Sequence, residues 1–203
     1  MSELLEKILS KDNMNTAYQR VCANKGAGGV DDVTVEELGD YIKENWESIR
    51  EQIRRREYNP CPVRRVEIPK PDGGVRKLGI PTVMDRVIQQ GIVQVISPMC
   101  EPLFSEWSYG FRPNRGCHEA IKEVYQRISY GKISYIVDAD IKGFFDHIDH
   151  EWMMKFLEWN IQDKNLLWLI RKYLKAGIME QGKFEPTEEG SAQGSVMSPM
   201  LAN

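Results

Sequence analysis

The chain has 203 residues, of which 41% are hydrophobic and 28% charged, with a formal net charge of −3. This length suits one large domain or two small ones with a substantial core. The chain is not globally basic, no apolar run is long enough to span a membrane, and the N-terminus lacks a signal-peptide core.

The cysteines of this chain exclude two common small-domain frameworks. They lie far apart without a C-x-x-C pair, at Cys22, Cys61, Cys100 and Cys117. Neither a zinc ribbon nor a disulfide framework is therefore supported. We expect reduced thiols in an intracellular, cytoplasmic protein.

Charge is distributed unevenly along the chain. Residues 50–86 contain ten Lys or Arg and five Asp or Glu, whereas residues 138–203 contain seven and eleven. A basic part and an acidic cleft suit a polyanion held by one part and metal ions held by the other. Two solvated surfaces of opposite sign are an equally good interpretation.

The first quarter of the chain is predicted to be helical. Residues 3–24 have helical apolar spacing and precede a flexible, cationic turn, KGAGG, at residues 25–29. Thr34 and Glu37 form a capping-box pattern that opens a second helix. That helix ends at Arg54–Arg56, where cations also complement the helix dipole.

A β-hairpin is predicted next. Two strands, residues 63–69 and 75–80, flank the turn KPDGG, in which Asp72 and Gly73 supply Asp-Gly turn chemistry. Cations protect an edge ribbon from aggregation. Because five of them exceed that need, we favour a flap that grips phosphates; they are Arg64, Arg65, Lys70, Arg76 and Lys77.

A mostly apolar helix over residues 84–103 is predicted to lie in the core. The loop that follows, SYGFRPNRGCH, interleaves aromatic residues with Arg112 and Arg115. Such a mixture suits nucleic-acid strands, and a packed irregular loop explains it equally well. Another helix is predicted over residues 117–130.

The most informative stretch reads YIVDADIKGFFDHIDH, residues 135–150. Its apolar start predicts a strand that carries Asp138 and Asp140 to a sheet edge. Side chains two residues apart on a strand point to the same face of the sheet. Two carboxylates so near each other repel unless a cation lies between them. This pattern predicts a site for a hard divalent ion, with Phe145 able to reach the same cleft.

The C-terminal quarter is predicted to contain helices at about 150–159 and 163–175, whose Trp and Met residues we assign to the core. A small hairpin is predicted over residues 177–184 and a helix near Ser198. The three histidines show no zinc spacing, so we expect surface or loop positions for His118, His147 and His150.

Several blocks in order give the chain a specific resemblance. From GAGGVDDVTVEEL onward, it resembles the reverse transcriptases encoded by bacterial group II introns, the intron maturase family. Four further blocks carry the likeness: VRRVEIPKPDGGVRKLGIPTVMDRVIQQ, EPLFSEWSYGFRPNRGCHEAI, VDADIKGFFDHIDH and AQGSVMSPMLAN.

The resemblance implies an α+β fold, the right-hand polymerase fold of a reverse transcriptase. Residues 1–58 would form an N-terminal helical, RNA-binding extension, residues 59–132 the fingers, and residues 133–203 a partial palm. It also implies an RNA-directed DNA polymerase that acts as a maturase on its intron RNA in splicing and retrohoming. RNA template, DNA primer and dNTP would be its substrates.

Specific positions inherit roles from this resemblance. Asp140 matches the catalytic aspartate that binds two Mg²⁺ ions, and the backbone carbonyl of Ile141 matches a second-metal ligand. Asp138 has no metal role in the family pattern and ranks below Asp140. Four residues match positions that contact the incoming nucleotide: Lys70 and Arg76 at its triphosphate, Phe145 as the gate against a ribose 2′-hydroxyl, and Gln193.

The clustered cations become candidates for binding intron RNA. They are Lys25, Arg54, Arg55, Arg56, Arg64, Arg65, Arg112 and Arg115. Apolar surface left bare by an incomplete palm would also favour a homodimer.

The sequence departs from the family pattern in two respects. It ends at Asn203, before the Tyr-Ala-Asp-Asp block with the other catalytic carboxylates, and Ala192 stands where relatives often have Pro. One carboxylate does not hold two Mg²⁺ ions tightly, so we expect a fragment that binds RNA without polymerising. The alternatives are an RNA-binding, dimerising scaffold and a retron-type or phage-defence reverse transcriptase. The long blocks and the N-terminal extension argue against the latter.

Overall fold

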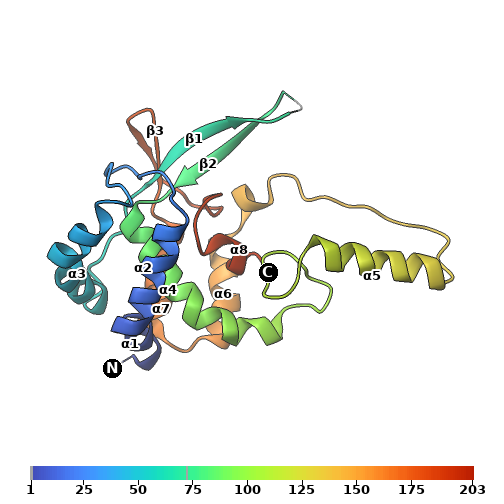
Figure 1. The fold of residues 1–203 in the computed structure, drawn as a ribbon, viewed down its shortest axis with the longest axis horizontal. Coiled ribbons are helices and arrows are strands. Elements are labelled where there is room, and N and C mark those ends of the chain that lie inside the picture. Colours follow the sequence, from blue (N-terminus) through green and yellow to red (C-terminus); the bar gives the residue numbers. More distant parts are fainter. Residues whose placement is uncertain (1, 72) are drawn as a thin grey trace.

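The computed structural model describes residues 2–71 and 73–203. It is an α+β fold in which helices surround α4 and a small sheet lies at one end (Figure 1). In chain order its elements are α1 (Glu3–Ile8), α2 (Lys11–Ala23), α3 (Leu38–Arg54), β1 (Val63–Pro69), β2 (Val75–Ile80), α4 (Val83–Cys100), η1 (Glu101–Leu103), α5 (Cys117–Tyr130), η2 (Phe144–His147), α6 (His150–Asn160), α7 (Lys164–Leu174), β3 (Ile178–Glu180), β4 (Lys183–Glu185) and α8 (Ser198–Leu201).

Helix α4 is the centre of the core, as its apolar spacing predicts. It begins after Thr82, whose hydroxyl accepts the N–H of Asp85 at 3.1 Å. Ile88, Ile92 and Ile96 are fully buried within it. Helices α1, α2 and α3 contact α4, and α7 contacts α1. None of the described helices combines the length and the apolar character that crossing a membrane requires.

The predicted hairpin is confirmed with its predicted bounds. β1 and β2 pair antiparallel, in a register that sets Arg64 opposite Ile80 and Ile68 opposite Arg76. Asp72, on which the Asp-Gly turn prediction rests, lies outside the described residues. The predicted hairpin near residues 177–184 is also confirmed, as β3 and β4.

The sheet has a strand pairing that local patterns did not predict. β3 runs parallel to β1, with Val63 beside Ile178, and the strand order is β2-β1-β3-β4. More than a hundred residues separate these two strands in the chain. This pairing brings the C-terminal quarter against the base of the β1–β2 hairpin.

The N-terminal region differs from the predictions in two details. Residues 3–24 form two helices, because the chain turns at Leu9 and Ser10. The KGAGG turn packs tightly rather than projecting freely: a Cβ on Gly29 would lie 2.6 Å from the Thr82 backbone. The reciprocal hydrogen bonds of the capping box form, with Thr34 N–H donating to Glu37 at 2.9 Å and Glu37 N–H to Thr34 at 3.3 Å, but they close a turn ahead of α3, which begins only at Leu38.

The strand predicted before Asp138 and Asp140 is wrong. Residues 132–141 form an extended, exposed segment without strand pairing, which runs from the far end of α5 back toward the body of the molecule (Figure 1). A strand is stable only when its N–H and C=O groups pair with a neighbour. No other strand in the described chain lies beside this segment.

The burial of α6 also differs from the prediction. Met154 is buried, but Trp152 and Trp159 are 57% and 87% exposed, so the assignment of these tryptophans to the core was wrong. They stand on the helix face opposite the one that packs on α7. The expected surface position of His150 was wrong as well, since its side chain is buried.

Candidate nucleotide-binding cavity

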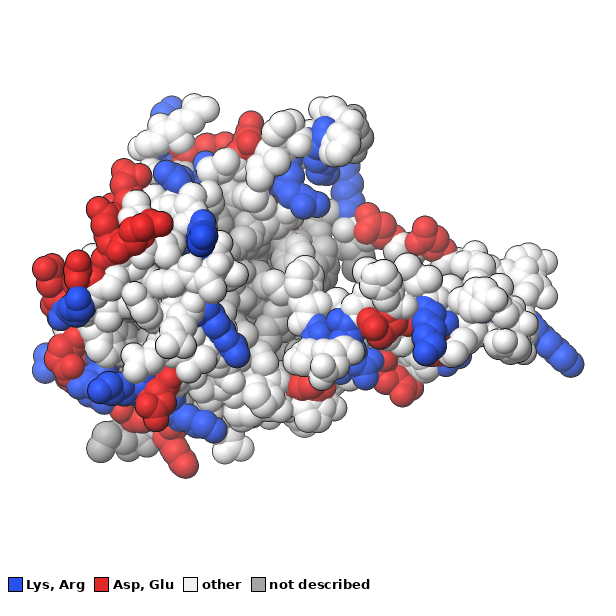
Figure 2. Space-filling view, viewed as in Figure 1, with Lys and Arg blue, Asp and Glu red and all other residues white. Residues whose placement is uncertain are grey.

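A cavity of about 250 Å³ lies where three segments meet: the base of the β1–β2 hairpin, η2, and the loop that follows β4. A space-filling view shows the surface hollowed beneath the hairpin, with Lys and Arg side chains along the hairpin rim (Figure 2). The cavity is lined by Val63, Arg65, Lys77, Gly79, Phe145, Asp146, Tyr173, Leu174, Ala176, Gly177, Ile178, Thr187, Glu189, Gly190, Ser191, Ala192 and Gln193.

The loop that carries Gln193 lies directly against β2. The N–H of Gly79 donates to the carbonyl of Gln193 at 2.7 Å. Two glycines permit this approach: a Cβ on Gly79 would lie 3.1 Å from the Ala192 Cβ of the loop, and one on Gly194 would lie 2.6 Å from the Gly79 carbonyl oxygen. Gly194 also has a φ of +115°, which L side chains rarely adopt.

The start of the same loop is bonded to the chain around η2. The N–H of Gly190 donates to Ile148 O at 2.7 Å, and the N–H of Ser191 donates to Phe145 O at 2.7 Å. His150 Nε2 lies 2.6 Å from the Gly190 carbonyl. Because a carbonyl only accepts, Nε2 carries the proton. The other ring nitrogen, Nδ1, is buried without a hydrogen-bond partner among the described residues.

The end of the loop is held from α4. Gln89 is 2% exposed, and its side-chain oxygen accepts the Ser195 hydroxyl at 2.8 Å and the Val196 N–H at 2.9 Å. Neither Gln89 nor His150 is predicted from the sequence to support this loop. A polar residue inside the apolar run of α4 was the available signal for Gln89, since buried polar groups need partners.

A buried carboxylate supports the cavity from below. Asp85 accepts hydrogen bonds from Tyr58 at 2.7 Å, Thr82 at 2.8 Å, the Cys61 N–H at 3.1 Å and Tyr173 at 3.1 Å. Burial raises the pKa of Asp85, and these donors oppose that rise. The cluster joins α4 and α7 to the segment before β1, and Tyr173 itself lines the cavity.

The cavity has charges of both signs. Arg65 and Lys77 reach it from the hairpin, whereas Asp146 lines it from η2 and Glu189 from the loop after β4. Lys77 is only loosely paired, with its nearest carboxylate oxygen 3.9 Å away on Glu180. The cations attract phosphate oxygens, and the acids repel them, so an anion in the cavity has a preferred orientation toward the hairpin.

The structure brings some of the predicted nucleotide-binding residues together and separates others. Phe145 and Gln193 line this cavity, and so does Arg65, which we had assigned to RNA. Lys70 and Arg76 line a separate, open depression at the far end of the hairpin, with Ile68 among their neighbours.

The predicted metal ligands do not form a metal centre in the described chain. Asp140 and Ile141 lie in the exposed segment, and Asp138 is exposed beside them. The described residues contain no group of three or more His, Cys, Asp or Glu side chains that could hold a metal ion. Asp140 therefore has no preformed set of metal-ligating side chains around it among the described residues.

Some of the arginines predicted to bind RNA are already bonded to other residues of the chain, whereas others are exposed. The Arg112 side chain is 4% exposed and donates to Glu101 and to the carbonyls of Ser105 and Ser108. Its burial contradicts the assignment to RNA and gives it a structural role in the loop.

Arg54 is also engaged within the chain, because its guanidinium donates to both carboxylate oxygens of Glu6, at 2.8 and 2.6 Å. The guanidinium of Arg64 forms an ion pair with Asp32, with 3.5 Å between Nη1 and the carboxylate oxygen Oδ1. Arg115 is partly buried, donates to the Glu106 carbonyl and lies over the Tyr109 ring. The remaining cations, Lys25, Arg55 and Arg56, are exposed, and Arg56 also donates to the Asn165 side-chain oxygen at 2.7 Å.

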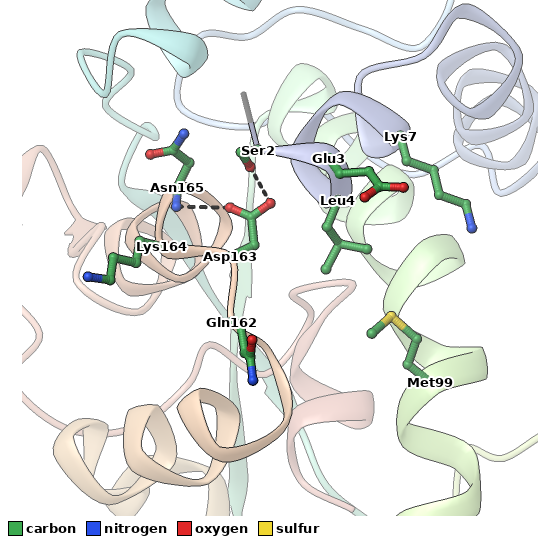
Figure 3. Close-up of a pocket in the computed structure, with 9 residues that line it drawn as sticks. All are labelled: Ser2, Glu3, Leu4, Lys7, Met99, Gln162, Asp163, Lys164 and Asn165. Carbon is green, nitrogen blue, oxygen red and sulfur yellow. Dashed lines mark hydrogen bonds between the residues drawn. The ribbon is translucent and has the colours of Figure 1, made fainter.

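A wider, open hollow of about 570 Å³ lies at the other end of the molecule, between α1, α7 and the end of α4 (Figure 3). Asp163 at its centre is already bonded to Ser2 and to the Asn165 N–H. Lys7 and Lys164 point away from Asp163 (Figure 3). No convergent set of reactive groups among the described residues marks this hollow as a catalytic site.

Comparisons with known proteins agree with the ordered sequence blocks. The family model described as reverse transcriptase (RNA-dependent DNA polymerase) matches residues 68–203. The group II intron-encoded protein LtrA of Lactococcus lactis subsp. cremoris is 37% identical over 205 residues. That match covers 100% of this chain and 33% of LtrA.

Other relatives match the chain along its whole length. Protein YkfC of Escherichia coli K12 is 34% identical over 208 residues, which cover 100% of this chain and 55% of YkfC. A putative COX1/OXI3 intron 1 protein of Saccharomyces cerevisiae is 31% identical, and 24% of it is covered. The chain thus spans between about a quarter and about half of the length of these relatives.

A solved structure supports the fold. The chain superposes on one component of a partial Cas6-RT-Cas1–Cas2 complex with a TM-score of 0.65 and 21% identity, covering 98% of this chain and 33% of that one. The ordered blocks, the fold and the family match lead to one conclusion. This chain belongs to the reverse transcriptase (RNA-dependent DNA polymerase) family, and group II intron-encoded proteins are its homologues along its whole length.

Proposed function

We propose that this chain provides the fingers and the first part of the palm of an RNA-directed DNA polymerase encoded by a group II intron. Residues 1–58 form the N-terminal extension, residues 59–132 the fingers, and residues 133–203 the partial palm. In the protein to which it corresponds, RNA template, DNA primer and dNTP are the substrates, and intron RNA is the partner in splicing and retrohoming.

One observation carries this proposal. Phe145 and Gln193, about fifty residues apart in the chain, line a single cavity together with cationic side chains from the hairpin. That combination offers a nucleotide an apolar wall, a polar contact and a positive charge for its phosphates. Arg65 and Lys77 would attract the triphosphate, and the Phe145 ring would exclude a 2′-hydroxyl by its bulk.

For the divalent metal that this family uses, we propose Mg²⁺. Asp140 and the Ile141 carbonyl offer hard oxygen atoms, which Mg²⁺ prefers. Because the described residues form no metal centre, the contribution that we assign to this chain is binding and orientation of the nucleotide. With Asp140 alone, we expect the chain to bind RNA and nucleotide without extending a primer.

We propose that intron RNA contacts the exposed cations at the end of α3 and in the turn before it. Arg55 and Arg56 are exposed, and Lys25 is exposed on the KGAGG turn. Cations of this kind release counterions on binding a polyanion, so the affinity falls steeply with salt. Lys70 and Arg76, at the end of the hairpin, are placed to contact the template or the nucleotide as the hairpin closes.

We also propose that the chain self-associates. Large apolar side chains are exposed on α5, on the extended segment after it and on α6. Val137 is 90% exposed and Trp159 87% exposed, which is unusual for a monomer surface. Light scattering after gel filtration that shows only monomer at micromolar concentration would remove this part of the proposal.

A binding-only scaffold and a retron-type enzyme are the alternatives. The family match and the full-length similarity to group II intron-encoded proteins favour the polymerase of that class over both. If primer extension by the chain alone were observed, the expected inactivity of a single carboxylate would be wrong.

The cavity can be tested by comparing dCTP and CTP binding, which differ only in the 2′-hydroxyl, in the Phe145→Val variant. We expect the intact chain to prefer dCTP, and the variant to lose several-fold of that preference while keeping its affinity for dCTP. The matched control is Phe144→Val, because Phe144 packs edge-on against Phe145 at 5.4 Å between ring centroids but does not line the cavity. Equal losses in both variants would contradict the proposal.

A further inference from the structure

A second cavity, of about 430 Å³, lies between α2, α3 and α4, and it shares no residue with the nucleotide-binding cavity. Its volume falls within the range of about 300–1,000 Å³ that is typical of ligand sites. It is lined by Leu9, Lys11, Met14, Asn15, Tyr18, Gly39, Ile42, Lys43, Trp46, Arg50, Met84 and Val87.

The interior of this cavity is apolar. Leu9, Met14, Met84 and Val87 form a buried floor. Trp46 adds a partly buried indole to the wall contributed by α3. Methionine and aromatic surfaces adapt well to an inserted apolar group. The cavity is therefore suited to an aliphatic or aromatic body.

The space between α2 and α3 exists because both helices pack on α4 while a glycine faces Tyr18. Gly39 lies on α3 at this point, and a Cβ there would lie 3.1 Å from the Tyr18 hydroxyl oxygen. A larger residue at Gly39 would press on Tyr18 and narrow the opening. The cavity thus follows from the backbone arrangement of three helices.

The rim of the cavity is cationic. Lys11, Lys43 and Arg50 line it, and no carboxylate of the described residues does. Lys43 and Arg50 are paired with Asp40 and Glu47 on the outer side of α3. In the described chain Lys11 makes no ion pair.

We propose that this cavity is a docking pocket for an acidic amphipathic segment of a partner protein. The segment would insert one large apolar side chain between Met14 and Trp46. It would place a carboxylate beside Lys11. The apolar floor of the cavity would bind the apolar side chain of the segment, and the positive rim would attract the neighbouring carboxylate.

The surroundings favour a protein segment over RNA. The outer faces of α3 carry acids, among them Asp40, Glu44 and Glu47, which would repel a continuous phosphate backbone. The lining also offers few groups for reading a base edge: apart from the cations, only Asn15, the Tyr18 hydroxyl and the Trp46 indole N–H are polar among the described side chains. A single carboxylate at the rim avoids both costs.

The proposal can be tested with small probes that share the indole ring system and differ in charge. Indole-3-acetate, indole and tryptamine would be titrated into the protein carrying ¹³C-methyl methionine, with NMR shifts as the readout. We expect the Met14 and Met84 methyls to shift, with affinity in the order acetate, indole, tryptamine. A short peptide with one Trp and one neighbouring Glu should shift the same methyls, and its counterpart with Lys in place of Glu should bind them more weakly.

Matched variants give the proposal its sharpest test. Lys11→Glu should weaken binding of indole-3-acetate and of the acidic peptide by about two- to fivefold, the range expected for an exposed ion pair. The fold should tolerate this change, since an acid in the first turn of α2 suits the helix dipole. The control is Lys122→Glu, an exposed cation on α5 outside the cavity.

Three results would overturn the proposal. The first is an absence of shifts at Met14 and Met84 with any indole probe. The second is equal affinity for indole-3-acetate and tryptamine. The third is a single-stranded RNA oligonucleotide that shifts these methyls more tightly than the acidic peptide does.

Discussion

The backbone of Gln193 is hydrogen-bonded to the backbone of Gly79, at 2.7 Å between the carbonyl oxygen and the amide nitrogen. This contact joins the loop after β4 to β2, the outer strand of the basic hairpin. A movement of the hairpin base therefore displaces the side of the cavity that Gln193 occupies. The coupling depends on glycines, because a side chain at Gly79 or at Gly194 would separate the two backbones.

Gly194→Ala should disturb this junction. The new Cβ would lie 2.6 Å from the Gly79 carbonyl oxygen, at a φ of +115°. We expect a loss of about 1–3 kcal/mol in the free energy of unfolding and weaker dTTP binding. Urea denaturation and nucleotide titration would measure both effects.

Gly182→Ala is the matched control for that change. Gly182 also has a positive φ, of +77°, but no atom of the described residues lies within 4 Å of the position that a Cβ would take there. This variant should lower the free energy of unfolding only by the strain of a positive φ at alanine, and it should leave dTTP binding unchanged. If both alanine variants bound dTTP equally well, the Gly79–Gln193 contact would not control the cavity.

Arg112→Ala should lower stability rather than RNA affinity. The guanidinium is buried and bonded to Glu101 and to two backbone carbonyls, so its removal leaves these acceptors without their donor. We expect a loss of about 2–4 kcal/mol, as is typical when one partner of a buried charged network is removed. Thermal or urea denaturation would measure this loss.

Arg55→Ala should show the opposite pattern. Its side chain is 67% exposed, so stability should change by less than about 0.5 kcal/mol. Binding of a structured group II intron RNA should weaken, and the slope of log affinity against log salt should fall by about one. An unchanged slope would exclude Arg55 from the RNA contact surface.

Asp85→Asn should destabilise the support beneath the cavity. The amide would place N–H donors among groups that already donate, including the Cys61 N–H and the Tyr58 hydroxyl. We expect a loss of about 1–3 kcal/mol in the free energy of unfolding. The control is Asp138→Asn, an exposed carboxylate that should have almost no effect; equal effects in the two variants would contradict the network's importance.

Asp163 should make stability depend on pH. It caps α7 through the Asn165 and Leu166 N–H groups, and its other oxygen accepts the Leu5 N–H of α1 at 3.0 Å. Burial raises the pKa of Asp163, but the hydrogen bonds from Ser2, Leu166, Leu5 and Asn165 outweigh this and hold the pKa below its ordinary value of 3.8.

The sign of that dependence follows from the lowered pKa. The stabilisation by Asp163 is present above the ordinary value of 3.8 and is lost as the pH falls through the lower folded-state pKa. Asp163→Ala should cost about 2 kcal/mol at pH 7, and the gap to the intact chain should close in strong acid. Asp149→Ala, which removes a cap from α6 alone, should cost less at pH 7.

Residue patterns alone were enough to predict most of the local elements and the family, although the strand expected before Asp138 did not form. The Thr34–Glu37 capping box, the β1–β2 hairpin and the apolar helix α4 were predicted from residues close together in the chain. Such signals are short-range: a cap bonds within one turn, and a hairpin pairs across its own turn. The ordered blocks identified the reverse transcriptase family, because several motifs in sequence order are far more specific than one.

Which of these residues meet depends on how the chain packs in three dimensions. The parallel pairing of β3 with β1 places Gln193 and Phe145 in one cavity with Arg65, and leaves Lys70 and Arg76 apart from it. Burial also depends on the tertiary structure: it places the His150 side chain inside the protein, where it is hydrogen-bonded to the Gly190 carbonyl of the loop. Pairing and burial depend on distant segments packing against one another, and no local spacing specifies that packing.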